Sequence, residues 1–198
     1  MTRTLYWLFG AALTLVPAVA SAHVGVGDTH GFVHGFSHPM SGLDHNLAMV
    51  AVGLFAAHLG GRALWLVPLT FVSVMAFAGV LGLAGVWLPF VEVGIAMSVV
   101  VFGLAIAFQL NVPTLAAMGL VGFFAIFHGY AHAVEMPESA SGLAYGVGFV
   151  FATGLLHAVG IGVALTISYA GQKYSHRIVQ VGGGAMAVAG VAIVFGIV

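Results

Sequence analysis

Cysteine is absent from the 198-residue chain. The protein therefore forms no disulfide, no thiolate-held zinc or iron–sulfur site and no CxxCH haem attachment. Lysine occurs once, at Lys173, and no G-x4-G-K-[ST] motif is present, which excludes ATP binding in the P-loop manner. The net charge of −1 argues against nucleic acid as a partner, because the phosphate backbone is bound mainly through clustered positive charge.

Charged residues of both signs are also scarce. They make up 5% of the chain, whereas about a quarter of a soluble domain is charged. Hydrophobic residues make up 62%, and the mean hydropathy is +1.17. This composition offers too little polar surface to cover a soluble globule, so it indicates an integral membrane protein. Histidine is the exception, because its ten copies outnumber the four basic and five acidic residues together.

The first 22 residues have the layout of a secretory signal peptide. Arg3 precedes an apolar run over residues 5–16, and the small residues Ala20, Ser21 and Ala22 follow Pro17. We predict a signal peptide in residues 1–22, and cleavage after Ala22 leaves His23 as the new N-terminus. The alternative is an uncleaved first transmembrane helix.

The remainder predicts an all-α fold, a polytopic membrane helical bundle. A His-rich periplasmic leader occupies residues 23–40, and a six-helix transmembrane transport domain occupies residues 41–198. Each apolar run approaches the ~20 residues that a helix needs to cross a bilayer, and the runs are too long and too continuous for strands. The expected transmembrane helices are 41–60, 64–86, 91–110, 114–134, 142–170 and 177–197.

The few charges are distributed unevenly over the expected loops. With the mature N-terminus in the periplasm, the cytoplasmic loops and the adjoining helix end hold all Lys and Arg of the mature chain, and the acidic residues lie on the outer side. This distribution follows the positive-inside rule and predicts a multi-pass protein of the bacterial inner membrane. The basic residues are Arg62, Lys173 and Arg177, and the acidic ones are Asp28, Asp44, Glu92, Glu135 and Glu138.

The first polar cluster is HPMSGLDH, residues 38–45. Pro39 disfavours helical geometry at His38, so we expect the helix to begin at Pro39 or Ser41. A capping box that starts at Ser41 would explain Asp44 on structural grounds alone. It would not explain His38 and His45, which with Asp44 form a plausible cation site.

The second polar cluster is FHGYAHAVE, residues 127–135. His128, His132 and Glu135 have i, i+4, i+7 spacing and therefore share one helix face. His-x3-His on a helix is a metal-chelating spacing. Glu135 lies at a helix C-terminus, where the dipole disfavours negative charge and a bound cation would relieve the conflict. The structural alternative is a pair of interfacial histidines bonded to backbone or water.

Five further polar residues lie outside the two polar clusters. His157 lies near the middle of the fifth expected helix, and a mid-membrane polar residue is a candidate for function, although a bond to a neighbouring helix is an equal explanation. A free His23 would chelate metal through its α-amine and imidazole. Glu92 has a sufficient explanation as a helix-start charge. His58 is either an exit ligand or an interfacial residue, and His176 is expected to be solvated.

Together these motifs resemble the HupE/UreJ family of nickel/cobalt permeases. The match consists of H-P-x-x-G-x-D-H at 38–45, F-H-G-x-A-H-x-x-E at 127–135 and L-H-A-x-G at 156–160, with the signal and the six apolar runs in the same order. The resemblance implies secondary uptake of Ni²⁺ or Co²⁺, often for assembly of hydrogenase or urease, with the metal as transported substrate and no resident cofactor. The residues agree independently, since imidazole and carboxylate suit borderline dications and the lack of thiols argues against Cu(I).

Four kinds of function remain open from the sequence alone. The leading hypothesis is a transporter, not an enzyme, whose site joins His38, Asp44 and His45 to His128, His132 and Glu135, with His157 deeper. The main alternative is an intramembrane metal-dependent hydrolase that uses the same cluster to hold zinc. A carrier of b-type haem would need paired histidines on facing helices, and the neighbouring carboxylates argue against it. A metal sensor would lack a signalling domain.

Overall fold

The computed structural model describes residues 31–137, 140–170 and 175–197. The predicted signal peptide and His23 lie outside these residues. The described part is helical and contains no strand, as the composition predicts. Its seven helices are α2 (Gly31–Ser41), α3 (Leu43–Leu59), α4 (Ala63–Leu83), α5 (Val91–Ala107), α6 (Thr114–Val134), α7 (Gly142–Ala170) and α8 (Ser175–Val194).

The six predicted transmembrane segments coincide with α3 to α8, but not all of these helices have the length of a full crossing. Four helices, α4, α6, α7 and α8, are long and apolar enough to cross a membrane. Helices α2 and α3 together would make a fifth crossing with an 85° bend, and α5 has only 17 residues. At 1.5 Å per residue α5 measures about 26 Å, less than the ~30 Å hydrocarbon core. The lengths and composition thus support a multi-pass membrane protein with four or five crossings, whereas the sequence predicted six.

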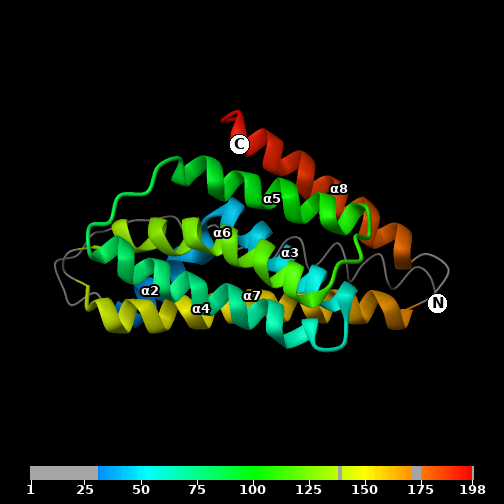
Figure 1. Ribbon diagram of the computed structural model, residues 1–198, viewed down its shortest axis with the longest axis horizontal. Coiled ribbons are helices and arrows are strands. Elements are labelled where there is room, and N and C mark those ends of the chain that lie inside the picture. Colours follow the sequence, from blue (N-terminus) through cyan, green and yellow to red (C-terminus); the bar gives the residue numbers. More distant parts are fainter. Residues whose placement is uncertain (1–30, 138–139, 171–174, 198) are drawn as a thin grey trace.

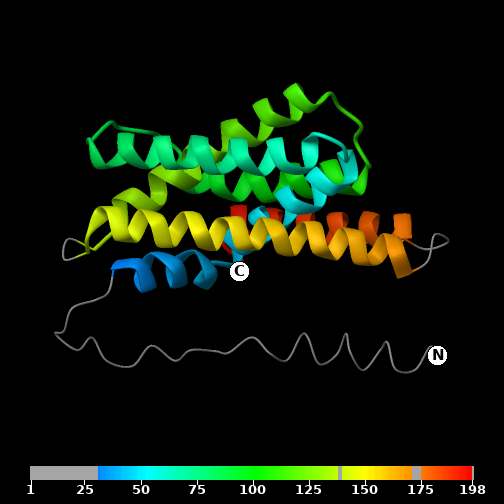
Figure 2. The ribbon, with the colours of Figure 1, turned by 90° about the horizontal axis from the view of Figure 1, so that it is seen from below.

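The helices pack in pairs. Helix α4 lies along α6, α5 lies along α8, and α7 contacts both α2 and α3. Figures 1 and 2 show α2 as a short helix that runs beside one end of the long α7. Glycines make the closest approaches, because a Cβ on Gly129 of α6 would meet the backbone of Met75 in α4, and one on Gly160 of α7 would meet Val50 of α3. Small residues at helix contacts are typical of membrane bundles, where lipid offers no hydrophobic drive for association.

The expected start of the first helix was wrong. Residues 31–41 form α2, and Pro39 lies inside this helix, so His38 is helical instead of preceding the helix. Pro39 has no N–H to donate to the carbonyl oxygen of Gly35, and α2 ends two residues later, at Ser41. The break comes at Gly42, whose φ of −85° and ψ of 125° are extended, and the chain turns sharply between α2 and α3. Half of the segment expected as a leader is therefore a helix packed on α7.

The expected capping box is also absent. The N-cap of α3 is Gly42, which has no side chain to cap with, and the hydroxyl of Ser41 instead donates to the carbonyl oxygen of His38 at 2.6 Å. Asp44 is the second residue of α3, and its Oδ1 accepts the backbone N–H of His45 at 2.7 Å. Asp44 thus keeps a favourable place in the first turn of the helix but is not part of a reciprocal cap.

Candidate metal centre

A cavity of about 160 Å³ lies at the end of the bundle where the α2–α3 bend meets the start of α5 and the end of α6. Six of its lining residues carry imidazole or carboxylate groups, and they come from three different parts of the chain. Because α3 and α5 begin here and α6 ends here, the topology brings both sequence motifs to one site. The titratable lining residues are His38, Asp44, His45, Glu92, His132 and Glu135.

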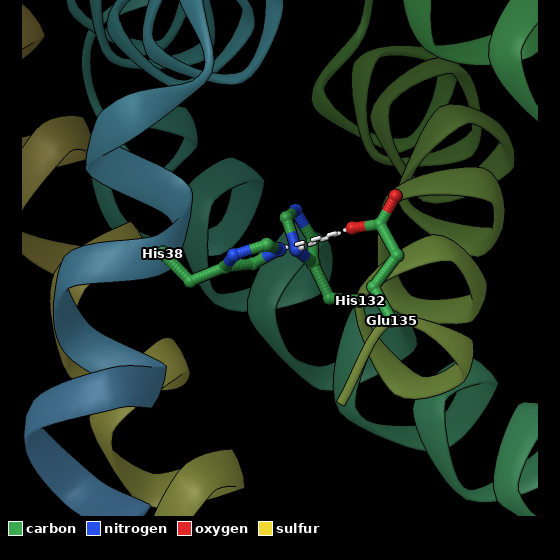
Figure 3. Close-up of side chains that lie close together, drawn as sticks. All are labelled: His38, His132 and Glu135. Carbon is green, nitrogen blue, oxygen red and sulfur yellow. Dashed lines mark hydrogen bonds and ion pairs between the residues drawn. The ribbon is translucent and has the colours of Figure 1, made fainter. Parts of the chain in front are cut away.

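His38, His132 and Glu135 form the outer part of this site. One ligand atom from each lies within 4.8 Å of the others. The Nε2–H of His38 donates to Oε2 of Glu135 at 3.0 Å, and Nδ1 of His132 lies 3.7 Å from the same oxygen. Figure 3 shows His38 reaching from α2 towards His132 and the Glu135 carboxylate at the end of α6. The side chains of His38 and Glu135 are 28% and 47% exposed, so this part of the site is open to a solute.

His45 connects the outer part of the site to a buried layer, which consists of His45 and His128. Its Nδ1 lies 2.9 Å from Nε2 of His132 and 3.1 Å from Nδ1 of His128. His45 and His128 are buried, at 2% and 0% exposure. His132 therefore presents one ring nitrogen to each layer, with Nδ1 towards Glu135 and Nε2 towards His45. The first motif and the second motif meet through these three imidazoles.

Ser98 of α5 sets the proton positions in the buried layer. Its hydroxyl donates to the carbonyl oxygen of Ile95 at 2.6 Å, and its oxygen lies 3.0 Å from Nε2 of His128. A hydroxyl has one hydrogen, so the second contact requires that His128 donates from Nε2–H. The Nδ1 lone pair of His128 then points at His45. Fixing one ring nitrogen by a hydrogen bond is how proteins orient an imidazole for ligation through the other.

His157 of α7 lies beyond this layer. It is 1% exposed, and neither ring nitrogen has a hydrogen-bond partner among the described residues. The Phe71 ring contacts both His128 and His157, with ring centroids 5.6 Å and 5.3 Å apart. The hydrogen bond to a neighbouring helix that was the structural explanation of His157 is thus not seen there. A buried imidazole without partners is costly, which points to a use other than fold stability.

Two acidic residues lie in the cavity wall outside the outer cluster. Asp44 lines the cavity, but its carboxylate accepts the His45 backbone N–H, and Asp44 is not one of the three clustered ligands. Glu92 lines the same cavity from the start of α5. The sequence did not indicate this position for Glu92, because the helix dipole alone explains a negative charge at a helix start. Ser98 was missed because nothing in the sequence pairs it with His128.

The comparisons with known proteins agree with the motifs. A family model described as HupE / UreJ protein matches residues 11–193. The chain is 49% identical over 187 residues to Protein HupE of Rhizobium leguminosarum bv. viciae, an alignment that covers 94% of this chain and 95% of the relative. No solved structure matches the chain significantly. With a family match over nearly its whole length, the chain belongs to the HupE/UreJ family.

Proposed function

We propose that the protein is a secondary transporter that takes up Ni²⁺, or Co²⁺, across the bacterial inner membrane, from a periplasmic mouth at the α2–α3 bend. The observation that carries this proposal is the position of His132, whose two ring nitrogens face two different sets of ligands. An ion bound by His38, Glu135 and Nδ1 of His132 would leave that nitrogen and be bound again by Nε2 of the same ring, together with His45 and His128.

The ligand types suit a borderline dication. The site combines imidazoles with carboxylates and has no thiolate or thioether in its wall. Such ligands favour Ni²⁺, Co²⁺ and Zn²⁺ over Cu(I), so discrimination among the first three depends on geometry and supply. The carboxylates of Asp44, Glu92 and Glu135 at the mouth would concentrate cations there.

The spacing of the buried nitrogens supports ligation with little rearrangement. Two nitrogens bound cis at about 2.1 Å from one ion lie about 3 Å apart in square-planar or octahedral geometry and about 3.4 Å apart in tetrahedral geometry. The separations of 2.9 and 3.1 Å around Nδ1 of His45 match the first value, although they are also those of N–H···N hydrogen bonds. A hydrogen that lies between two of these nitrogens would have to give way when a metal binds there, either to the other nitrogen of the same ring or to solvent.

A route further inwards would pass His157, which contacts the same Phe71 ring as His128. The membrane potential can drive the movement without ATP. A dication that moves inwards gains about 4–5 kcal/mol per 100 mV, at about 2.3 kcal/mol per charge. That drive is sufficient for uptake of a scarce metal.

The metal would serve maturation of a nickel enzyme. The resemblance of the motifs to permeases that supply hydrogenase or urease supports this context, and the lipid bilayer and the ion are the only other partners we propose. The predicted leader would add a first capture site at His23, outside the described residues.

The test is metal uptake into proteoliposomes with an imposed potential. We expect the wild type to accumulate Ni²⁺ or Co²⁺ in preference to Zn²⁺, faster when the interior is negative. His128→Ala should abolish accumulation, and Phe123→Leu, at an exposed site on the same helix, should not. Uptake by His128→Ala at the wild-type rate would refute the proposal, and chelator-sensitive hydrolysis of lipid or peptide by the purified protein would favour the hydrolase instead.

A further inference from the structure

A larger cavity, of about 490 Å³, lies at the opposite end of the bundle from the metal centre. It is lined from the C-terminal ends of α3, α5 and α7 and from the start of α8. Two of its lining residues are histidines, His58 and His176, and Gln109 lies between the helices that carry them. None of the residues assigned to the metal centre lines it.

The two imidazoles differ in their partners. Nε2 of His58 is buried and has no hydrogen-bond partner among the described residues. Nδ1 of His176 lies 3.0 Å from the Gln109 amide nitrogen, and His176 is exposed, as the sequence predicted. Rotating the side-chain amide of Gln109 by 180° places its Oε1 at the same contact, where Oε1 accepts a hydrogen bond from Nδ1–H of His176. The lone pair on Nε2 of His176 is then free for a ligand.

The backbone at Gln109 is unusual for its residue type. Its φ of 50° is left-handed, and the bonds from Gln109 N to Ile106 O and from Leu110 N to Ala105 O close α5 in the way that normally uses Gly or Asn. A non-glycine residue in this conformation costs free energy, and such positions concentrate at functional sites. The strained residue, Gln109, is the one whose side chain contacts His176.

The helix ends around the cavity favour a cation. His58 lies in the last turn of α3, Gln109 just after α5, and Ser168 in the last turn of α7. The C-terminal ends of these three helices each carry a partial negative charge, which the N-terminus of α8 in the cavity wall opposes in part. Among the residues that the structure describes, no Asp or Glu lines the cavity. A dication would thus meet imidazoles and helix C-termini, and would be bound more weakly than at the acidic metal centre.

From these observations we propose that this cavity is a second divalent-cation site, bound by His58 and His176, with Gln109 as a positioning residue for His176. In the transport scheme it would be the last binding position before release, and this role alone rests on the proposed function. Binding itself does not depend on transport.

Equilibrium dialysis of Ni²⁺ with the purified full-length protein tests the proposal. We expect a tight and a weak class of bound ion in the wild type. The double variant His58→Gln, His176→Gln should lose the weak class and keep the tight one, and Glu135→Gln should weaken the tight class and leave the weak one. The protein must carry no polyhistidine tag, and because the His-rich leader is common to all variants, its contribution cancels in the difference.

The outcomes separate this inference from the transport proposal. A weak class of unchanged size in the double variant overturns the second site, whether or not the protein transports nickel. Loss of that class from a protein that moves no metal supports the site and refutes transport. If the double variant does not fold, His58→Gln alone decides, because its free nitrogen has no partner to lose. Gln109→Gly should relieve the backbone, keep the melting temperature and still weaken the second site, whereas an unchanged affinity contradicts the positioning role.

Discussion

Replacing Gly129 by alanine should disturb the metal centre without touching a ligand. Gly129 follows His128 in α6 and lies against the backbone of Met75 in α4. An added Cβ would come within 2.7 Å of the Met75 carbonyl carbon and 2.9 Å of its Cα, and closer still to the carbonyl oxygen. Non-bonded carbons pack at about 3.5–4.0 Å, so α4 and α6 must separate by about 1 Å.

This separation has two measurable consequences. Overpacking of this kind costs about 1–3 kcal/mol, which the gain of up to about 1 kcal/mol from placing alanine in a helix only partly offsets. Metal ligands must be placed to within about 0.2 Å, so a shift of His128 and His132 should raise the dissociation constant for Ni²⁺ at least about tenfold. Thermal unfolding in detergent and nickel titration measure the two effects.

Gly119→Ala is the matched control on the same helix. A Cβ at Gly119 would meet nothing within 4 Å. We therefore expect unchanged nickel affinity and unchanged or slightly higher stability, because alanine is the better helix former. If the two variants have the same melting temperature and the same nickel affinity, the close contact between α4 and α6 does not position the site.

Three further predictions concern the ligands themselves. Ser98→Ala removes the acceptor of the His128 Nε2–H and should lower nickel affinity about tenfold, whereas Ser98→Thr retains it; equal affinity in the two variants would argue against the role of Ser98. His157→Phe should slow uptake into proteoliposomes but leave the nickel affinity measured by dialysis unchanged, since His157 lies beyond the histidines of the metal centre. An unchanged rate of uptake would show that the ion does not pass His157. Added Ni²⁺ at about one hundred times its dissociation constant should stabilise the protein by about 2.7 kcal/mol in a melting experiment, and a shift that persists in Glu135→Gln, His45→Ala would place the ion elsewhere.

The apolar runs predicted the helices well because they are separated by clear interruptions. The run at 114–134 agrees with α6, and the run at 142–170 agrees with α7. The sequence could not predict α2, because local rules place a break before Pro39. That helix is stabilised from outside its own sequence, where Gly35 and Gly148 let α2 and α7 approach at backbone distance.

The residue types of the site could be predicted from the sequence, but the contacts between residues on different helices could not. Helical spacing alone put His128, His132 and Glu135 on one face. That His45 would lie between His128 and His132 depends on how α3 crosses α6, which no local pattern encodes. The sequence did not assign Glu92 and Ser98 to the site, because a glutamate at a helix start and a serine in a membrane helix each have a sufficient local explanation.

The central claim is that both motifs bind the same ion. Nickel X-ray absorption of the purified protein, saturated at one ion per chain, tests it most directly, because imidazole ligands give a characteristic multiple-scattering pattern. We expect a spectrum dominated by imidazole nitrogen, from which either His45→Ala in the first motif or His132→Ala in the second removes ligands. A spectrum that one of these changes leaves unaltered would show that only one motif binds the metal.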